Sequence, residues 1–184
     1  MKVSDYICQF LLDHGIDTIF CVRGDAISPL LNSIKRRPEL TIYFNYGEMG
    51  CAMAAESFQR VGGKIPLVLT NMGPGATNAI TGVVGAWQES VPYLVISGQC
   101  STSQAGCVPE LPMAPIVETF TKYAASVRCG TVPRRIPPRG PFSAQSSAAE
   151  RACAAGCDSA VRAVLLQRPA SCGAYLGYGG VPNA

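Results

Sequence analysis

Four short apolar runs alternate with helical patterns in the first half of this chain, and that alternation limits the fold more than any other feature. The runs cover residues 18–22, 41–45, 65–70 and 91–97. Each is continuous and rich in β-branched side chains, which is typical of strands buried on both faces. Strand and helix in alternation, joined by right-handed crossovers, give a parallel sheet with helices on both faces. We therefore predict an α/β fold.

The helices between these runs are bounded by local signals. Ser4 is the expected N-cap of the first helix, which ends at His14-Gly15. A second helix begins after Ser28, with Lys35, Arg36 and Arg37 in its last turn, and stops at Pro38. The remaining predictions are helices at 49–60 and 76–87, one or two helical turns at 115–120, and an edge strand at 121–127.

Length and composition indicate one domain without a membrane segment. The chain has 184 residues, of which 48% are hydrophobic, and a net charge of +3. No apolar run approaches the roughly 18 residues that a membrane span needs. The N-terminus has the pattern of a helix and not of a signal peptide, so we expect a cytoplasmic protein. The charge is too small to indicate a nucleic-acid partner.

The charge is unevenly divided along the chain. Up to Val127 there are 8 basic and 10 acidic residues, whereas from Arg128 onward there are 7 arginines, no lysine and 2 acidic residues. Periodicity also ends there, and only residues 147–166 have helix propensity. We predict a domain over residues 1–127 and an irregular, atypical tail over 128–184. Two explanations fit the tail: a frame-shifted or otherwise aberrant end of a truncated enzyme, and a basic disordered segment.

The nine cysteines do not form a metal-binding pattern. Cys8, Cys21 and Cys51 fall in apolar patterns, where cysteine acts as a small buried hydrophobe. Cys153 and Cys157 are the closest pair, but the other half of a tetrahedral site is missing. No metal site is predicted from the residues of this chain.

Glu48 and the turn Gly73-Pro74-Gly75 are the candidates for chemistry, because each lies where a strand ends and a helix begins. Apolar neighbours of Glu48 are expected to raise its pKa toward the range useful for proton transfer. The alternative is a solvated carboxylate stabilised by the helix dipole. The glycine turn is either a phosphate cradle or a plain turn that packs a strand against a helix. It matches no standard phosphate motif, since no Lys follows and Asn78 stands at the third glycine position of a dinucleotide motif.

Three segments in order carry a family resemblance. They are Tyr46-Gly47-Glu48-Met49-Gly50 with the alanine-rich helix after it, Gly73-Pro74-Gly75-Ala76-Thr77-Asn78, and Glu89-Ser90-Val91-Pro92 leading to Ile96-Ser97-Gly98-Gln99. Together they resemble the N-terminal pyrimidine-binding domain of thiamine diphosphate-dependent enzymes, the acetolactate synthase-like branch in particular. The resemblance runs from about Met1 to Val127 and implies the thiamine diphosphate-binding, flavodoxin-like fold.

The resemblance implies a cofactor and a role for each matching residue. A glutamate at the position of Glu48 bonds N1′ of the aminopyrimidine and favours the tautomer that removes the thiazolium C2 proton. A 2-oxo acid is then decarboxylated and joined to a second carbonyl. Gly73, Pro74 and Asn78 match the wall of the aminopyrimidine pocket, and Gly24 lies in the loop that approaches it. Gln99 matches a position near the substrate.

The sequence also departs from that family. The family loop Gly-x-Pro-Gly is Cys21-Val22-Arg23-Gly24 here, and Gly47 replaces the histidine that commonly precedes the glutamate. The family holds the diphosphate through Mg²⁺ on a second domain with a Gly-Asp-Gly motif, which this sequence does not contain. Mg²⁺ is therefore expected only through a missing or partner domain.

Three functions remain open at this point. The first is the N-terminal part of an acetolactate synthase-like carboligase or decarboxylase, inactive alone and completed by a homodimer or a partner chain with the diphosphate-binding domain. The second is one subunit of a split thiamine diphosphate-dependent decarboxylase. The third is a non-catalytic flavodoxin-like interaction module. In both enzyme hypotheses the isolated chain exposes an apolar patch around the site.

Overall fold

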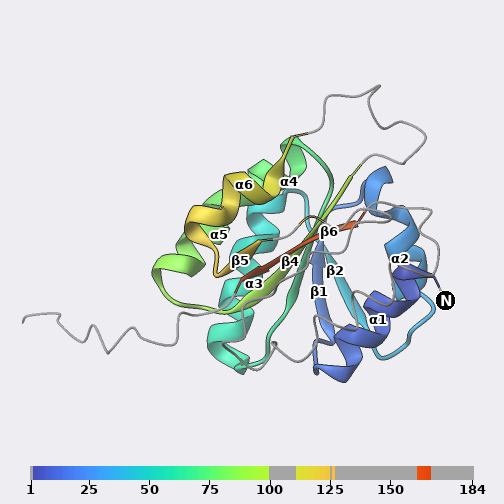
Figure 1. Ribbon diagram of the computed structural model, residues 1–184. Coiled ribbons are helices and arrows are strands. Elements are labelled where there is room, and N and C mark those ends of the chain that lie inside the picture. The colour runs from blue at the N-terminus through green and yellow to red at the C-terminus, as the bar shows by residue number, and fades with distance from the viewer. Residues whose placement is uncertain (1, 100–110, 125, 127–160, 167–184) are drawn as a thin grey trace, which may run out of the picture.

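The protein is built on one twisted sheet with helices on both faces (Figure 1). The computed structural model describes residues 2–99, 111–124 and 126, and the strand at 161–166. The strand order is β2-β1-β3-β4-β6-β5. The first four strands are parallel, so the predicted fold class is confirmed.

The four predicted strands form, each shorter than its apolar run. They are β1 (Thr18–Cys21), β2 (Thr41–Phe44), β3 (Leu67–Thr70) and β4 (Tyr93–Gly98). Every residue of β1, β3 and β4 is buried, as expected for strands covered on both faces. The same expectation for β2 is wrong. It is an edge strand with only β1 beside it, and Tyr43 and Phe44 are 52% and 42% exposed.

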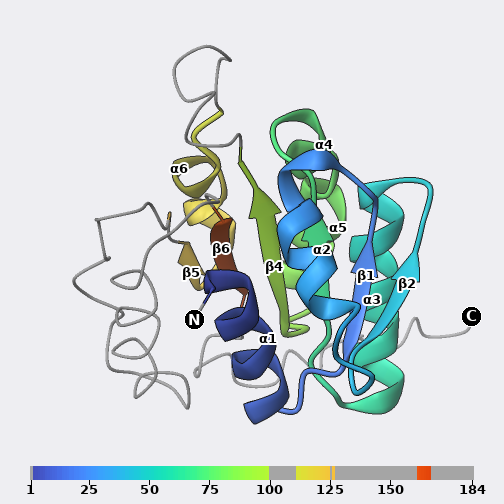
Figure 2. The same cartoon turned by 90° about the vertical axis from the view of Figure 1, so that its right-hand side faces the viewer.

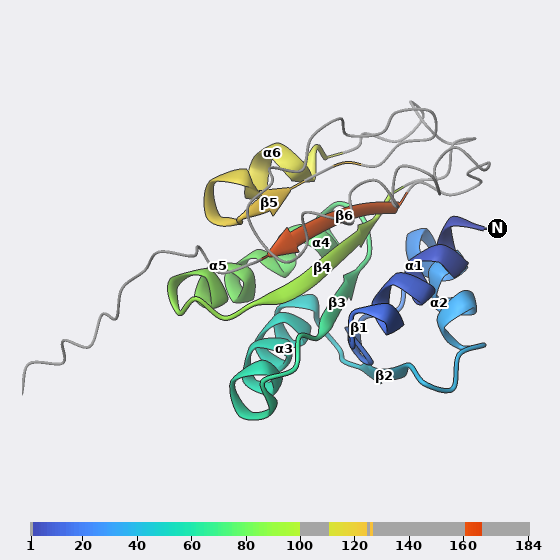
Figure 3. The ribbon, with the colours of Figure 1, turned by 60° about the horizontal axis from the view of Figure 1, so that its bottom comes forward.

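Successive strand residues point into two separate cores. Ile19 and Leu67 lie in the core beneath α1 (Val3–Asp13) and α2 (Ser28–Ile34). Phe20 and Val68 lie in the core on the opposite face, beneath α3 (Glu48–Gly62) and α5 (Ile80–Gln88). Figures 2 and 3 show the two helix layers on either side of the sheet. The alternation follows from the two-residue period of a strand.

Most differences from the predicted helices lie at their ends. A 3₁₀ turn, η1 (Asp25–Ile27), precedes α2, which ends at Ile34, so the three basic residues 35–37 follow the helix instead of forming its last turn. The predicted helix at 76–87 is divided into α4 (Pro74–Asn78) and α5. Gly63 ends α3 with φ of +68°, a left-handed conformation that glycine adopts without a Cβ clash.

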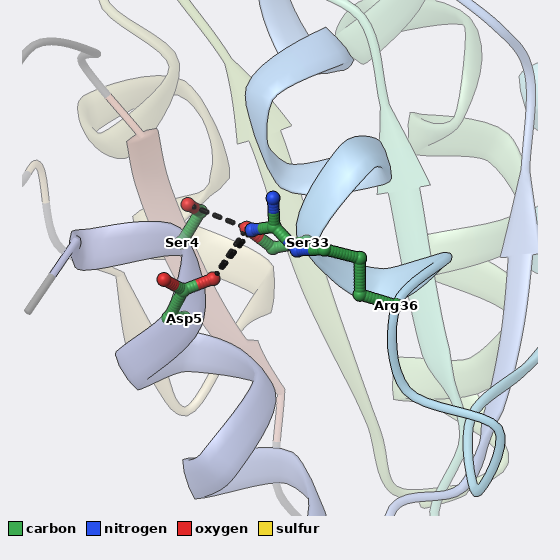
Figure 4. Close-up of polar contacts among 4 residues, drawn as sticks. All are labelled: Ser4, Asp5, Ser33 and Arg36. Carbon is green, nitrogen blue, oxygen red and sulfur yellow. Dashed lines mark hydrogen bonds and ion pairs between the residues drawn. The ribbon is translucent and has the colours of Figure 1, made fainter.

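A polar cluster joins α1 to α2 (Figure 4). The hydroxyl of Ser33 donates to Asp5 Oδ1 at 2.7 Å and lies 2.8 Å from Ser4 Oγ. Arg36 Nη2 donates to the same Asp5 oxygen at 2.9 Å. Ser4 is thus a buried residue inside α1, and the N-cap is Lys2, because the hydroxyl that was expected to cap the helix lies against Ser33.

The C-terminal half adds to the sheet edge. The helical turns expected at 115–120 are α6 (Met113–Val117) and η3 (Glu118–Phe120), and the expected edge strand is present as β5 (Tyr123–Ala124). The helix propensity of residues 147–166 does not predict the structure of the last six. These residues form β6 (Val161–Leu166), because β4 supplies antiparallel backbone partners for them. Residues 147–160 lie outside the described residues. The domain boundary at Val127 stays a prediction.

No helix within the described part of the chain combines the length and apolar character needed to cross a bilayer. The cytoplasmic location stays a prediction.

Candidate functional site

The topology places a switch point at the carboxyl ends of β1 and β3. From β1 the chain passes over one face to β2, and from β2 it returns over the other face to β3. β1 and β3 are neighbours at the point where the direction of winding reverses, which is where open α/β sheets bind ligands. Gly24 follows β1 and Asn71 follows β3, so both lie at this edge.

Glu48 lies at the same edge as the first residue of α3. The preceding Gly47 is extended and caps the helix, which places the carboxylate at its N-terminus. Asn78, the last residue of α4, donates from Nδ2 to Glu48 Oε2 at 3.0 Å. A Cβ on Gly75 would lie 2.7 Å from Glu48 Oε1, so a glycine is needed there for the carboxylate to occupy this position. Among the described residues no group donates to Oε1, which leaves that oxygen available to a ligand.

The loop after β1 is held against the residue after β3. A Cβ on Gly24 would lie 2.3 Å from Asn71 Cγ, so the Asn71 side chain fills the space that a larger residue would need. Ser28 Oγ donates to the Gly24 carbonyl at 3.1 Å and fixes the peptide from the other side. Asn71 Oδ1 is buried and accepts no hydrogen bond from the described residues. A buried amide oxygen without a donor is costly unless a ligand supplies one.

Most of the predicted site residues come together here. Glu48, Asn78 and Gly24 lie at this switch point, while Gly73 caps α4 with φ of +57° and Pro74 is its exposed first residue. Gln99 follows β4, one strand further along, and is 7% exposed. The role of each residue toward a cofactor stays a prediction.

Sequence reasoning missed Asn71 as a site residue. The signal that could have found it is a polar side chain placed directly between a fully buried strand and a glycine-rich turn, where two site loops meet.

Two buried thiols lie beneath the carboxylate. Burial, and to a smaller extent the neighbouring Cys51 and Glu48, raises the pKa of Cys21 to about 12. Burial likewise raises the pKa of Cys51, which accepts a 3.6 Å contact from Asn45 Nδ2. Both side chains are therefore neutral thiols packed in the protein, and the expectation of small buried hydrophobes is confirmed for Cys8, Cys21 and Cys51. The described residues contain no group of three or more His, Cys, Asp or Glu side chains that could hold a metal ion.

Large apolar side chains close to Glu48 in the sequence are exposed. They are Tyr43, Phe44, Tyr46, Met49 and Met53, all at least 41% exposed, and we call this set the β2–α3 patch. Tyr46 is fully exposed. Four of them, Tyr43, Phe44, Tyr46 and Met49, are the apolar neighbours expected to surround Glu48, and each leaves at least 41% of its surface exposed to solvent.

Comparison with known proteins decides the family. Residues 1–124 match the model of the thiamine pyrophosphate enzyme, N-terminal TPP binding domain. This chain belongs to that family.

Its curated relatives include acetolactate synthases. The chain is 33% identical over 127 residues to the acetolactate synthase large subunit of Lactococcus lactis, covering 68% of this chain and 22% of the relative. It is 35% identical over 131 residues to the mitochondrial acetolactate synthase of Schizosaccharomyces pombe, covering 70% of this chain and 20% of that protein. The chain thus corresponds to the N-terminal region of acetolactate synthase large subunits and spans about a fifth of their length.

A solved structure supports the fold. The thiamine diphosphate-dependent 4-hydroxybenzoylformate decarboxylase of Rhodococcus jostii RHA1 superimposes with a TM-score of 0.65 at 20% identity, over 70% of this chain and 25% of that chain. The likeness concerns the fold alone. Family membership gives thiamine diphosphate as the cofactor to consider at the edge of the sheet where Glu48 lies.

Proposed function

We propose that this chain supplies the aminopyrimidine-binding half of an acetolactate synthase-like active site, with Glu48 as the residue that bonds N1′ of thiamine diphosphate. The observation that carries the proposal is the free Oε1 of Glu48, at the carboxyl edge of the sheet, while Oε2 is held by Asn78. An oriented carboxylate with one oxygen open can accept a hydrogen bond from a ring nitrogen and stabilise its protonated form.

The residues present fit the aminopyrimidine. Glycines at positions 24 and 75 leave space that a Cβ would fill, and the buried Asn71 Oδ1 needs a donor such as an amino group. Glu48 would hold the ring, Gly73, Pro74 and Asn78 would form the wall beside it, and Gln99 would lie toward the substrate. When bound, the cofactor supplies the electron sink for decarboxylation and carbon–carbon bond formation. The protein groups orient the ring, and Oε1 of Glu48 accepts the hydrogen bond from its protonated nitrogen.

The remaining parts of the site are assigned to another domain or chain. The relatives extend far beyond the matched region, since only 20–22% of their length is covered. We propose that a diphosphate-binding domain, in a homodimer or on a partner chain, brings Mg²⁺ and covers the β2–α3 patch. The substrate class is a 2-oxo acid, as the relatives' acetolactate synthase activity requires.

Calorimetric titration tests the proposal. The full chain is titrated with thiamine diphosphate and Mg²⁺, with and without a partner chain that carries the diphosphate-binding domain. We expect binding with the partner, and Glu48→Gln to abolish the activity of the mixture. Glu39→Gln is the matched control, because Glu39 is an exposed carboxylate just before β2, at the amino ends of the strands and away from the proposed site. Absence of thiamine diphosphate binding in both arrangements would favour the non-catalytic module instead.

A further inference from the structure

Arg23 lies at the same carboxyl edge as Glu48, directly before Gly24. Its guanidinium Cζ is 4.6 Å from the centroid of the Phe44 ring. Phe44 ends β2, and its register partner in β1 is Cys21, so the aromatic ring lies beside the strand from which Arg23 emerges. A cation stacked on an aromatic face is oriented by the ring quadrupole.

The charge of Arg23 is not neutralised within the described residues, where the guanidinium makes neither an ion pair nor a hydrogen bond. Two other arginines differ in this respect: Arg36 pairs with Asp5 at 2.9 Å and Arg60 with Glu56 at 2.6 Å. Stacking uses the face of the guanidinium and leaves its in-plane N–H donors free. Arg23 is therefore a pre-oriented cation with unused donors.

The backbone that carries Arg23 is fixed on both sides. Asn71 fills the space beside Gly24, and Ser28 donates to the Gly24 carbonyl at 3.1 Å. The same Asn71 connects this loop to the site, because a Cβ on Gly75 would lie 3.3 Å from Asn71 Cβ and 2.7 Å from Glu48 Oε1. Gly24, Asn71, Gly75 and Glu48 thus pack closely one against the next, and Arg23 directly precedes the first of them in the chain.

We propose that Arg23, braced on Phe44, is a specificity-determining residue that binds a second anionic group of the 2-oxo acid. This inference rests on the proposed function. Planar, forked donors suit a carboxylate, which they bind through two parallel hydrogen bonds. The carboxylate that leaves as carbon dioxide is a poor ligand for this arginine, because a strong ion pair stabilises it in the ground state and opposes its loss. The chemistry therefore favours a carboxylate that is retained in the reaction.

The test compares two acids of equal chain length. The full chain, mixed with a partner chain that carries the diphosphate-binding domain, is titrated with 2-oxoglutarate and with 2-oxopentanoate, in the presence of thiamine, by calorimetry and by NMR of the Arg23 Nε–H and the Phe44 ring. We expect 2-oxoglutarate to bind at least about tenfold more tightly, as for one charge-assisted hydrogen-bonded pair. The preference should fall below about twofold in Arg23→Gln and be partly kept in Arg23→Lys.

The control is Lys35→Gln, which removes the same charge from an exposed side chain. Lys35 follows α2 and lies toward the amino ends of the strands, away from the proposed site. It should keep the preference. Equal binding of the two acids, no binding of either, or a preference that survives Arg23→Gln overturns the inference. The inference is also overturned if Arg23→Gln loses affinity for thiamine diphosphate but not for thiamine. The anion bound by Arg23 would then be the diphosphate of the cofactor. Thiamine binding that Glu48→Gln weakens supports the proposed function separately.

Discussion

Asn78 and Glu48, 30 residues apart in the chain, are joined by a hydrogen bond from Nδ2 to Oε2 of 3.0 Å. The bond connects the end of α4 to the start of α3, and it determines which carboxylate oxygen remains open. Substitution Asn78→Ala should therefore weaken thiamine diphosphate binding about tenfold, the usual effect of losing one hydrogen bond to a charged group. Calorimetry under the conditions that support binding by the wild type measures this.

Asn32→Ala is the matched control for Asn78. Asn32 is an exposed asparagine of α2 and lies on the other face of the sheet. Its replacement should leave cofactor affinity within about twofold. Equal affinity of the Asn78 variant and the wild type would show that the bond does not position Glu48.

Gly75→Ala should weaken cofactor binding and leave the stability of the fold nearly unchanged. The new Cβ would lie 2.7 Å from Glu48 Oε1, so the carboxylate, the mobile end of a long side chain, must move away. We expect cofactor affinity to fall more than tenfold and the free energy of unfolding to change by less than about 1 kcal/mol. Gly50→Ala is the control, since a Cβ there meets nothing within 4 Å and helix propensity favours alanine. Unchanged affinity in Gly75→Ala would contradict the assigned position of Glu48.

The parts of the fold that the sequence predicted are those fixed by local pattern. Continuous apolar runs identified β1, β3 and β4, because the burial of a strand residue is reflected in the apolar character of its neighbours. The sequence did not reveal that β2 is an edge strand. An apolar run has the same composition whether one or two strands flank it, and strand order depends on long-range pairing.

The sequence indicated candidate site residues but not the contacts between them. Glu48 and Asn78 were both identified, yet the bond between them requires α4 to end beside the start of α3, which no spacing rule gives. Asn71 was missed because its importance comes from the close approach of two loops. The roles of these residues depend on a ligand and stay predictions.

Gly82→Ala should destabilise the protein by overpacking the contact between α3 and α5. A Cβ at this position would lie 2.5 Å from Ala52 Cβ and 3.2 Å from two backbone atoms, so the helices must separate. Overpacking of this kind costs about 1–3 kcal/mol. Urea denaturation should show it, with Gly85→Ala in the same helix as control, because its new Cβ would make only a 3.5 Å contact with Glu56 Oε2. An unchanged midpoint for Gly82→Ala would contradict the packing.

Acid should weaken the α1–α2 junction. The hydrogen bond from Ser33, followed by the bond and charge of Arg36, lowers the pKa of Asp5 below its ordinary value of 3.8. Because the folded pKa is the lower one, this stabilisation is present at neutral pH and is lost as pH falls below about 4–5 toward the folded value. Urea midpoints at pH 7 and pH 3.5 should show a smaller acid loss in Asp5→Asn than in the wild type. Asp25→Asn, at an exposed carboxyl outside this cluster, should keep the wild-type loss. Equal acid sensitivity of Asp5→Asn and the wild type would contradict the assignment.

The β2–α3 patch should cause the isolated chain to associate. Met49 and Met53 are one helical turn apart on α3 and are 41% and 45% exposed, so they present adjacent apolar side chains on one face of the helix. Burying a methionine side chain contributes about 1.5–3 kcal/mol, which is tenfold or more in an association constant. Met49→Gln combined with Met53→Gln should therefore weaken self-association at least tenfold in sedimentation velocity. Val61→Gln changes an apolar side chain that is 92% exposed at the other end of α3, and it should leave association unchanged. A wild-type chain that stays monomeric at high concentration would show that this surface needs no partner.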